Sequence, residues 1–285
     1  MPGLNEIKSR LEGVRGTKQI TRAMRLVSVS KSQRAKAQLV GATPFFNQVS
    51  VAMSEILSAH ADIESPFLIK RSEGRSLCLV IAGDKGMAGP YNNNIIKFTT
   101  ASVEKSSSTL LVAGFTGRSA LRRRGFDVDA DFTFPVMNPN LRRARDVSEI
   151  LTDRYLNGGY NEVIVIFTFM ESAMRQEPRL LRVLPLRREN FLDGFTKADD
   201  DADIVKYEPD ATTVFNHITP HYVTGVTYGA FVEAFSSEQQ ARIMAMDNAT
   251  KSADDIISRL SLEYNRARQA LITREITEIV SGMPD

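Results

Sequence analysis

The residues most able to take part in chemistry form a glycine-rich loop, residues 83–89 (GDKGMAG), which directly follows an apolar run. Such a loop cradles phosphate groups when its backbone N–H groups converge, as in the G-x-G-x-x-G and G-x-x-x-x-G-K-[ST] motifs. Here the glycines recur at intervals of three, which matches neither motif. We therefore interpret residues 83–89 as a structural turn and expect no cofactor there.

The other side chains suited to catalysis or metal binding do not combine into a site. The three histidines, His60, His217 and His221, have no Cys, Asp or Glu partner at metal-ligand spacing. No G-x-S-x-G elbow, Cys–His arrangement or compelling carboxylate pair supplies a nucleophile or a general base. We expect no metal and no catalytic residue, and therefore a protein that catalyses nothing alone.

The single cysteine, Cys78, lies inside the apolar run 76–82. One cysteine cannot form an internal disulfide framework, which fits a reducing cytoplasm. We expect Cys78 to be a buried strand residue.

The middle of the chain alternates between two kinds of segment. The apolar runs 77–82, 109–115 and 163–169 are rich in β-branched residues, which is typical of strands buried on both faces. Helix-compatible stretches lie around 94–105, 119–124 and 146–155, and Pro90 is suited to opening a helix. This order predicts βαβ units and a Rossmann-like α/β domain with a parallel sheet. The acidic run 199–203 predicts a solvated loop.

The sequence predicts a long helix at each end of the chain. No proline occurs between Pro2 and Pro44, or between Pro220 and Pro284. Apolar residues recur every three or four positions, which predicts a coiled-coil seam on each helix. The expected seam positions are Leu4, Ile7, Leu11, Val14, Thr17, Ile20, Met24 and Val27 near the start, and Ala253, Ile257, Leu260, Tyr264, Ala267 and Leu271 near the end.

We expect the two narrow stripes to pack against each other in antiparallel orientation. Because each glycine in a helix interior costs about 1 kcal/mol relative to alanine, Gly225 and Gly229 predict that the regular C-terminal helix begins near Phe231. The predicted domains are an N-terminal coiled-coil helix at 1–60, an α/β domain at 70–195, and a C-terminal coiled-coil helix at 205–285 that pairs with the first.

Charge is distributed unevenly although the formal net charge of the 285 residues is only +2. Nine Lys and Arg residues lie between Lys8 and Lys36, against only Glu6 and Glu12 in the first 36 positions. This surface is either a solvated face, a contact for an acidic protein surface, or a nucleic-acid contact. No stretch approaches about 18 consecutive apolar residues, so we expect membrane association only through other proteins.

Four motifs, in order, resemble the gamma subunit of bacterial F-type ATP synthases. Residues 20–24 (ITRAM) are similar to the family's IT[KR]AM signature, and residues 84–92 (DKGMAGPYN) to its DRGLCGGFN loop, although Ala88 and Pro90 depart from that pattern. Residues 207–210 (YEPD) resemble the segment that meets the membrane ring. The longest match runs from 237 through 250 (SEQ to MDNAT) to 263–280 (EYNRARQ, IT and EITEIV).

The resemblance implies a central rotor shaft that couples ion flow through a membrane ring to ATP synthesis, at the cytoplasmic face of the bacterial membrane. It implies contacts with the alpha and beta subunits of the head, the epsilon subunit and the c-type ring. The implied head contacts are Arg22, Met24, Arg25, Lys31, Arg266, Arg268 and Gln269, and the implied contacts with epsilon and the ring are Tyr207, Glu208 and Asp210.

Each implied role has an alternative. Met24 and Ile20 also fit as seam residues, while Tyr207 and Glu208 also fit as the end of a strand or a helix cap. Two other classes of protein stay open: a nucleotide-binding enzyme with coiled-coil arms, which would bind ATP or a dinucleotide, and a coiled-coil nucleic-acid-binding protein, which would bind DNA with a steep salt dependence. Neither alternative accounts for four motifs in order, and we expect no nucleic-acid partner.

Overall fold

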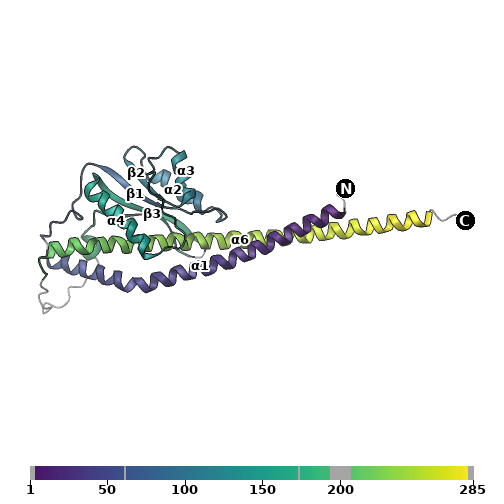
Figure 1. Ribbon diagram of the computed structural model, residues 1–285, viewed down its shortest axis with the longest axis horizontal. Helices are drawn as coiled ribbons and strands as arrows, with labels where there is room; N and C mark the ends of the chain where they lie inside the picture. Colours follow the sequence, from purple (N-terminus) through teal and green to yellow (C-terminus); the bar gives the residue numbers. More distant parts are fainter. Residues whose placement is uncertain (1–3, 61, 173, 193–206, 282–285) are drawn as a thin grey trace. The chain divides into compact units, whose positions relative to one another are not determined.

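The computed structural model describes residues 4–60, 62–172, 174–192 and 207–281 (Figure 1). Its contacts divide the chain into two compact units, residues 1–29 with 242–285, and residues 30–241. Helices α1 (Leu4–Ala59) and α6 (Ala211–Ser281) contribute to both units. The predicted fold class, long terminal helices with a central α/β domain, is confirmed. The acidic run 199–203 lies outside the described residues.

In the first unit, the start of α1 packs against the end of α6 with the two helices running in opposite directions. Residues that come later along α1 meet residues that come earlier along α6. In order along α1, the contacts are the apolar cluster of Ile7, Leu11 and Leu260, the ion pair of Lys18 with Asp254, the hydroxyl contact of Thr21 with Thr250 at 2.8 Å, and the ion pair of Arg25 with Asp247 at 2.7 Å. The predicted antiparallel pairing is therefore present in this unit.

The predicted α1 seam is wrong in its second half. Ile20 and Val27 are 61% and 52% exposed, whereas Thr21 and Ser28 are buried. The buried stripe keeps the alternating spacing of three and four residues, but polar side chains occupy it from Lys18 to Ser28, so an apolar pattern does not reveal it there. On α6, the predicted seam residue Leu271 is 42% exposed.

The second unit contains a four-stranded sheet with strand order β2-β1-β3-β4. Strand β1 (Arg75–Ile81) pairs in parallel with both β2 (Ser108–Ala113) and β3 (Tyr160–Met170), as predicted. Strand β4 (Gln176–Leu184) was not predicted and pairs antiparallel with β3 at the sheet edge. Its Pro178 and adjacent Leu180 and Leu181 break the alternation that marks a strand in sequence, and proline is tolerated at an edge.

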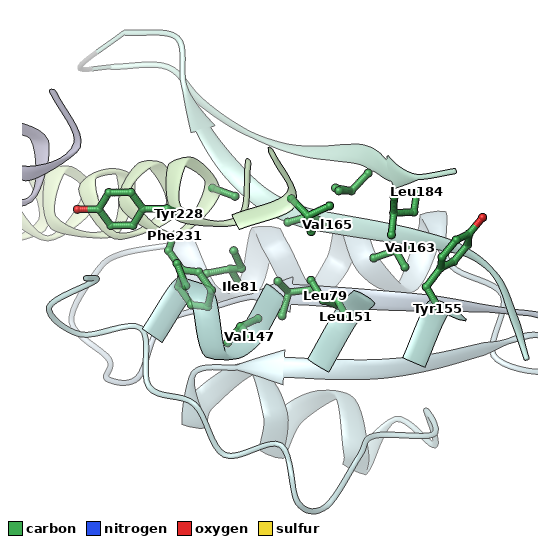
Figure 2. Close-up of a cluster of buried hydrophobic side chains, with 14 of the residues drawn as sticks. Leu79, Ile81, Val147, Leu151, Tyr155, Val163, Val165, Leu184, Tyr228 and Phe231 are labelled. Atoms are coloured by element: carbon green, nitrogen blue, oxygen red, sulfur yellow. The ribbon is translucent and has the colours of Figure 1, made fainter. Parts of the chain in front are cut away.

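Alternate residues of the three parallel strands point to opposite faces of the sheet, and both faces are covered. Helices α2 (Tyr91–Ser102) and α3 (Phe115–Arg123) cover one face, where Cys78, Val80 and Val112 are buried. The other face packs against α4 (Leu141–Asn157) and α6. Figure 2 shows this second core, formed by Leu79, Ile81, Val163, Val165 and Leu184 of the sheet, Val147, Leu151 and Tyr155 of α4, and Tyr228 and Phe231 of α6. A short helix α5 (Glu189–Leu192) follows β4.

Helix α6 begins 20 residues before the position predicted from its glycines, at Ala211 rather than near Phe231. The glycines are tolerated because tertiary packing overrides helix propensity. A Cβ atom on Gly225 would lie 2.5 Å from the Phe46 ring of α1, so only glycine allows the two helices to approach this closely. Gly229 has nothing within 4 Å of the same position.

Candidate functional site

The glycine-rich loop at 83–89 is held by the side chains of Asp84, within the loop, and Asn92, at the start of α2. Asp84 Oδ2 accepts hydrogen bonds from the backbone N–H groups of Val136 and Met137 at 2.9 and 2.8 Å. Asn92 Oδ1 accepts from Gly83 N at 2.8 Å. The carboxylate and the amide that follow β1 therefore join neighbouring segments of the domain, which agrees with the interpretation of the loop as a structural turn.

Doubly wound sheets bind ligands at the carboxyl ends of their strands, where successive connections leave in opposite directions. In this sheet, with strand order β2-β1-β3-β4, the connections diverge between β1 and β3. Helix α6 occupies this position. Ser237 Oγ donates to Thr168 O at 3.1 Å, and Glu233 Oε1 accepts from Met170 N at 2.8 Å. The Tyr91 hydroxyl donates to Ala234 O of the same helix at 3.0 Å. The chain's own helix thus fills the crevice that holds nucleotides in enzymes of this fold.

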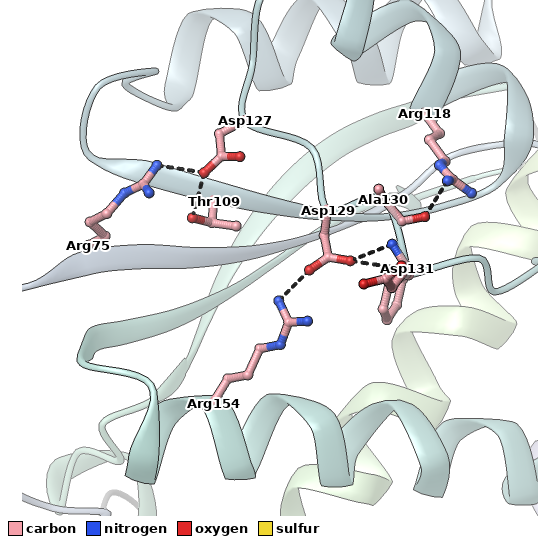
Figure 3. A network of polar contacts seen from close by, with 9 residues as sticks. Arg75, Thr109, Arg118, Asp127, Asp129, Ala130, Asp131 and Arg154 are labelled. Carbon is pink, nitrogen blue, oxygen red and sulfur yellow. Dashed lines mark hydrogen bonds and ion pairs between the residues drawn. The ribbon is translucent and has the colours of Figure 1, made fainter.

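A second group of charges braces the segment that follows α3 (Figure 3). Asp129 forms an ion pair with Arg154 at 2.6 Å and accepts the N–H groups of Asp131 and Phe132 at 2.9 and 2.8 Å. Burial by itself raises the pKa of Asp129, but the Arg154 guanidinium and the two N–H groups outweigh burial and lower that pKa. A separate contact joins Arg75 and Thr109 to Asp127 at 2.8 and 3.0 Å. The carboxylates of Asp129 and Asp127 therefore hold neighbouring segments of the domain together.

Two of the three histidines, His60 and His221, pack against aromatic rings. The His60 ring centroid lies 5.7 Å from that of Tyr207, and that of His221 lies 6.2 Å from Phe45. Within the described ranges, no three His, Cys, Asp or Glu side chains gather closely enough to hold a metal ion. None of the helices in these ranges is both long and apolar enough to cross a membrane.

The four implied contact residues on α1 differ in their surroundings. Arg22 and Lys31 are exposed, whereas Met24 is half-buried. Arg25 is also half-buried and forms the ion pair with Asp247 of α6, so its charge is partly compensated within the first unit. Met24 therefore keeps both of its possible roles, a seam contact and an outward contact.

On α6, the implied contacts Arg266, Arg268 and Gln269 are all exposed. Sequence reasoning missed a set of exposed apolar side chains in the same unit, since it placed some of them on the seam and did not weigh the others. These are Ile20, Leu26, Val27, Leu262, Ile272 and Ile276, each at least 42% exposed. Exposed large apolar side chains on paired helices are typical of surfaces that contact other proteins.

Residues 207–210 precede α6. Tyr207 is half-buried and packs against the core that Figure 2 shows. Burial raises the pKa of its hydroxyl, and the nearby charge of Glu55 raises it further. Glu208 is exposed. Asp210 caps α6: its carboxylate accepts from Thr213 N at 2.8 Å and from the Thr213 hydroxyl at 2.7 Å, contacts that lower its pKa. Asp210 therefore has a structural role whether or not it also contacts a partner.

These features together define a class of protein. The terminal helices pair in antiparallel orientation, the ligand crevice of the sheet is filled, and basic and apolar side chains are exposed on the helices. We conclude that the chain is a coiled-coil subunit that acts through contacts with other proteins.

Comparison with known proteins gives the family. The model of the ATP synthase family (ATP-synt) matches residues 3–284. The chain is 45% identical to the ATP synthase gamma chain of Ruminiclostridium cellulolyticum, covering 98% of this chain and 97% of the relative, and 41% identical to that of Acetivibrio thermocellus, covering 99% and 98%. The chain belongs to the ATP synthase gamma chain family.

A solved structure shares the fold. One chain of the Euglena gracilis mitochondrial ATP synthase, from a structure described as OSCP/F1/c-ring, matches with a TM-score of 0.66 and 17% identity. The match covers 98% of this chain and 92% of that chain.

Proposed function

We propose that this chain is the central rotor subunit of a membrane-associated F-type ATP synthase. In this role it is non-catalytic, and it couples ion translocation through a membrane ring to ATP synthesis or hydrolysis at the beta subunits by rotating. The observation that carries the proposal is the antiparallel pairing of α1 and α6 in the first unit, because two helices packed along their length form a stiffer shaft than one helix alone. Family membership over nearly the whole chain supports the same role.

We further propose that the head of alpha and beta subunits contacts the outward side chains of the paired helices. The proposed contacts are Arg22, Met24, Arg25, Lys31, Arg266, Arg268 and Gln269. The exposure of five of these seven residues supports the proposal. Exposed ion pairs contribute only about 0.2–1 kcal/mol each, whereas burying one Leu or Ile contributes about 1.5–3 kcal/mol. Contacts of the weaker kind can break and re-form as the helices turn.

At the other site, we propose that Tyr207, Glu208 and Asp210 contact the epsilon subunit and the c-type ring. The exposed Glu208 is the best placed of the three for a polar contact. We propose that the subunit is attached to the cytoplasmic face of the bacterial cell membrane through these partners. The division into functional parts at 1–60, 70–195 and 205–285 is likewise a proposal.

The head contacts are tested by replacing two of them together, Arg266→Ala and Gln269→Ala, in the assembled complex. Because both side chains are exposed, we expect the fold to stay intact, and we expect ATP synthesis coupled to ion flow to fall several-fold. Unchanged synthesis would refute the assigned role. The control is Arg142→Ala with Asn93→Ala, which removes similar exposed side chains from the α/β domain and should leave synthesis unchanged.

A further inference from the structure

A basic pocket lies on the α/β domain, away from the filled crevice and from the proposed contact residues. It has a volume of about 680 Å³ and lies between the segment before β1, the start of β3, the end of β4 and the segment after it. Its charged lining consists of Lys70, Arg71, Arg182, Arg187 and Arg188, against Glu162 and Glu189.

Internal contacts account for only part of this charge. Both oxygens of Glu162 are engaged, one by Arg182 at 2.7 Å and the other by the Ser76 hydroxyl at 2.7 Å. Arg71 donates to the carbonyls of Tyr155 and Tyr160, which are neutral acceptors. Once the Glu162–Arg182 pair is set aside, four cations face a single carboxylate, that of Glu189.

Two of these cations are the ones available to a ligand. Lys70 and Arg187 are exposed, and among the described residues neither takes part in an ion pair. Their backbone segments are joined, because Leu186 N donates to Phe67 O at 2.7 Å. Arg188 is anchored by the carbonyl of His60 at 3.3 Å. The walls that carry the two cations are therefore held together by the fold.

From this excess of fixed positive charge we propose that the pocket binds a phosphate-bearing anion with several negative charges. Arginine and lysine together suit such a ligand, because the guanidinium binds two oxygens and the ammonium acts as a point charge. The volume lies within the range of small-molecule sites, about 300–1,000 Å³, and exceeds what one inorganic phosphate fills. This proposal does not depend on the rotor role.

The test measures binding of sodium tripolyphosphate to the full chain by calorimetry at low ionic strength. The wild-type chain should bind it saturably, and Lys70→Gln with Arg187→Gln should weaken binding about tenfold or more, because two charge-assisted contacts are lost. The control, Lys97→Gln with Arg142→Gln, removes equal charge from exposed positions outside the pocket and should change affinity less than about twofold.

A second arm distinguishes a soluble ligand from a lipid headgroup by using phosphatidylcholine vesicles with and without phosphatidylglycerol. Binding to the anionic vesicles that is lost in the pocket variant but kept in the control supports the same site with a lipid phosphate as its source. Equal losses in both double variants, or no saturable binding to either probe, would overturn the proposal. Circular dichroism and matched melting temperatures exclude misfolding of the variants.

Discussion

Cys78 lies in the middle of β1, with none of its surface exposed. Burial, and then the nearby charge of Glu162, raise the pKa of its thiol to about 12. The thiolate is the reactive form, so we expect no reaction with a maleimide at pH 8 until the domain unfolds. As a control, Met174→Cys introduces a thiol at a position that is 86% exposed and should react at once. Rapid labelling of the wild-type chain would contradict the burial described here.

Asp129 gives a pH-dependent prediction. Its folded pKa lies below the unfolded value of about 3.9, so its contribution to stability is fully present above that pH and is lost as the pH falls through the folded pKa. We expect Asp129→Asn to lower the free energy of unfolding at pH 7 by about 1–2 kcal/mol, since Arg154 loses its charged partner.

Urea denaturation at pH 7 and pH 3 measures this effect. The deficit of Asp129→Asn relative to wild type should shrink at pH 3, because this pH lies below the unfolded pKa of the carboxyl group, so that the unfolded wild-type chain gains stability by binding a proton there. The exposed Asp131 is the matched control, and Asp131→Asn should change stability by less than about 0.5 kcal/mol. A deficit that is the same at both pH values would contradict the account of this ion pair.

At the scale of elements, Gly225 and Gly229 separate packing from helix propensity within one helix. Alanine favours a helix over glycine by about 1 kcal/mol, so Gly229→Ala should raise the melting temperature. Gly225→Ala should instead destabilise the domain by about 1–3 kcal/mol, because the new methyl group meets the Phe46 ring. Thermal melts of the two variants decide the matter, and stabilisation by both would mean that α1 and α6 do not approach closely here.

The elements that the sequence predicted well are those whose buried positions are apolar. The three parallel strands were found because Val, Ile and Leu fill both of their faces. Strand β4 was missed because only its last residues are buried, and the seam of α1 was misplaced where Thr21 and Ser28 replace apolar residues. Gly225 of α6 lies against Phe46 of α1, which is far from it in sequence, and no local pattern reveals this contact.

For the candidate sites too, the sequence indicates some features, whereas others depend on contacts between distant residues. The resemblance named Arg266, Arg268 and Gln269 as contacts with the head, which stays a prediction, and the structure finds all three side chains exposed. Motifs could not show that Arg25 pairs with Asp247 or that Asp210 caps α6, because both facts depend on which residues meet in three dimensions. They also could not show that α6 fills the crevice of the sheet.

In the molecule as a whole, the filled crevice and the paired helices both fit a subunit that transmits force. In the α/β domain, α6 lies where a nucleotide binds in enzymes of this fold. Hydrogen bonds of Glu233, Ser237 and Tyr91 hold the domain to this helix. A force applied to the domain is therefore passed to α6. This is the behaviour that a rotor subunit requires.

The most direct test observes rotation of this subunit in the assembled complex. A bead is attached through Met174→Cys, whose exposed thiol reacts while Cys78 stays protected, and the head is fixed to a surface. We predict that the bead turns in one direction when ATP is added and stops when ATP is removed. A bead that stays still while the same complexes hydrolyse ATP would contradict the account.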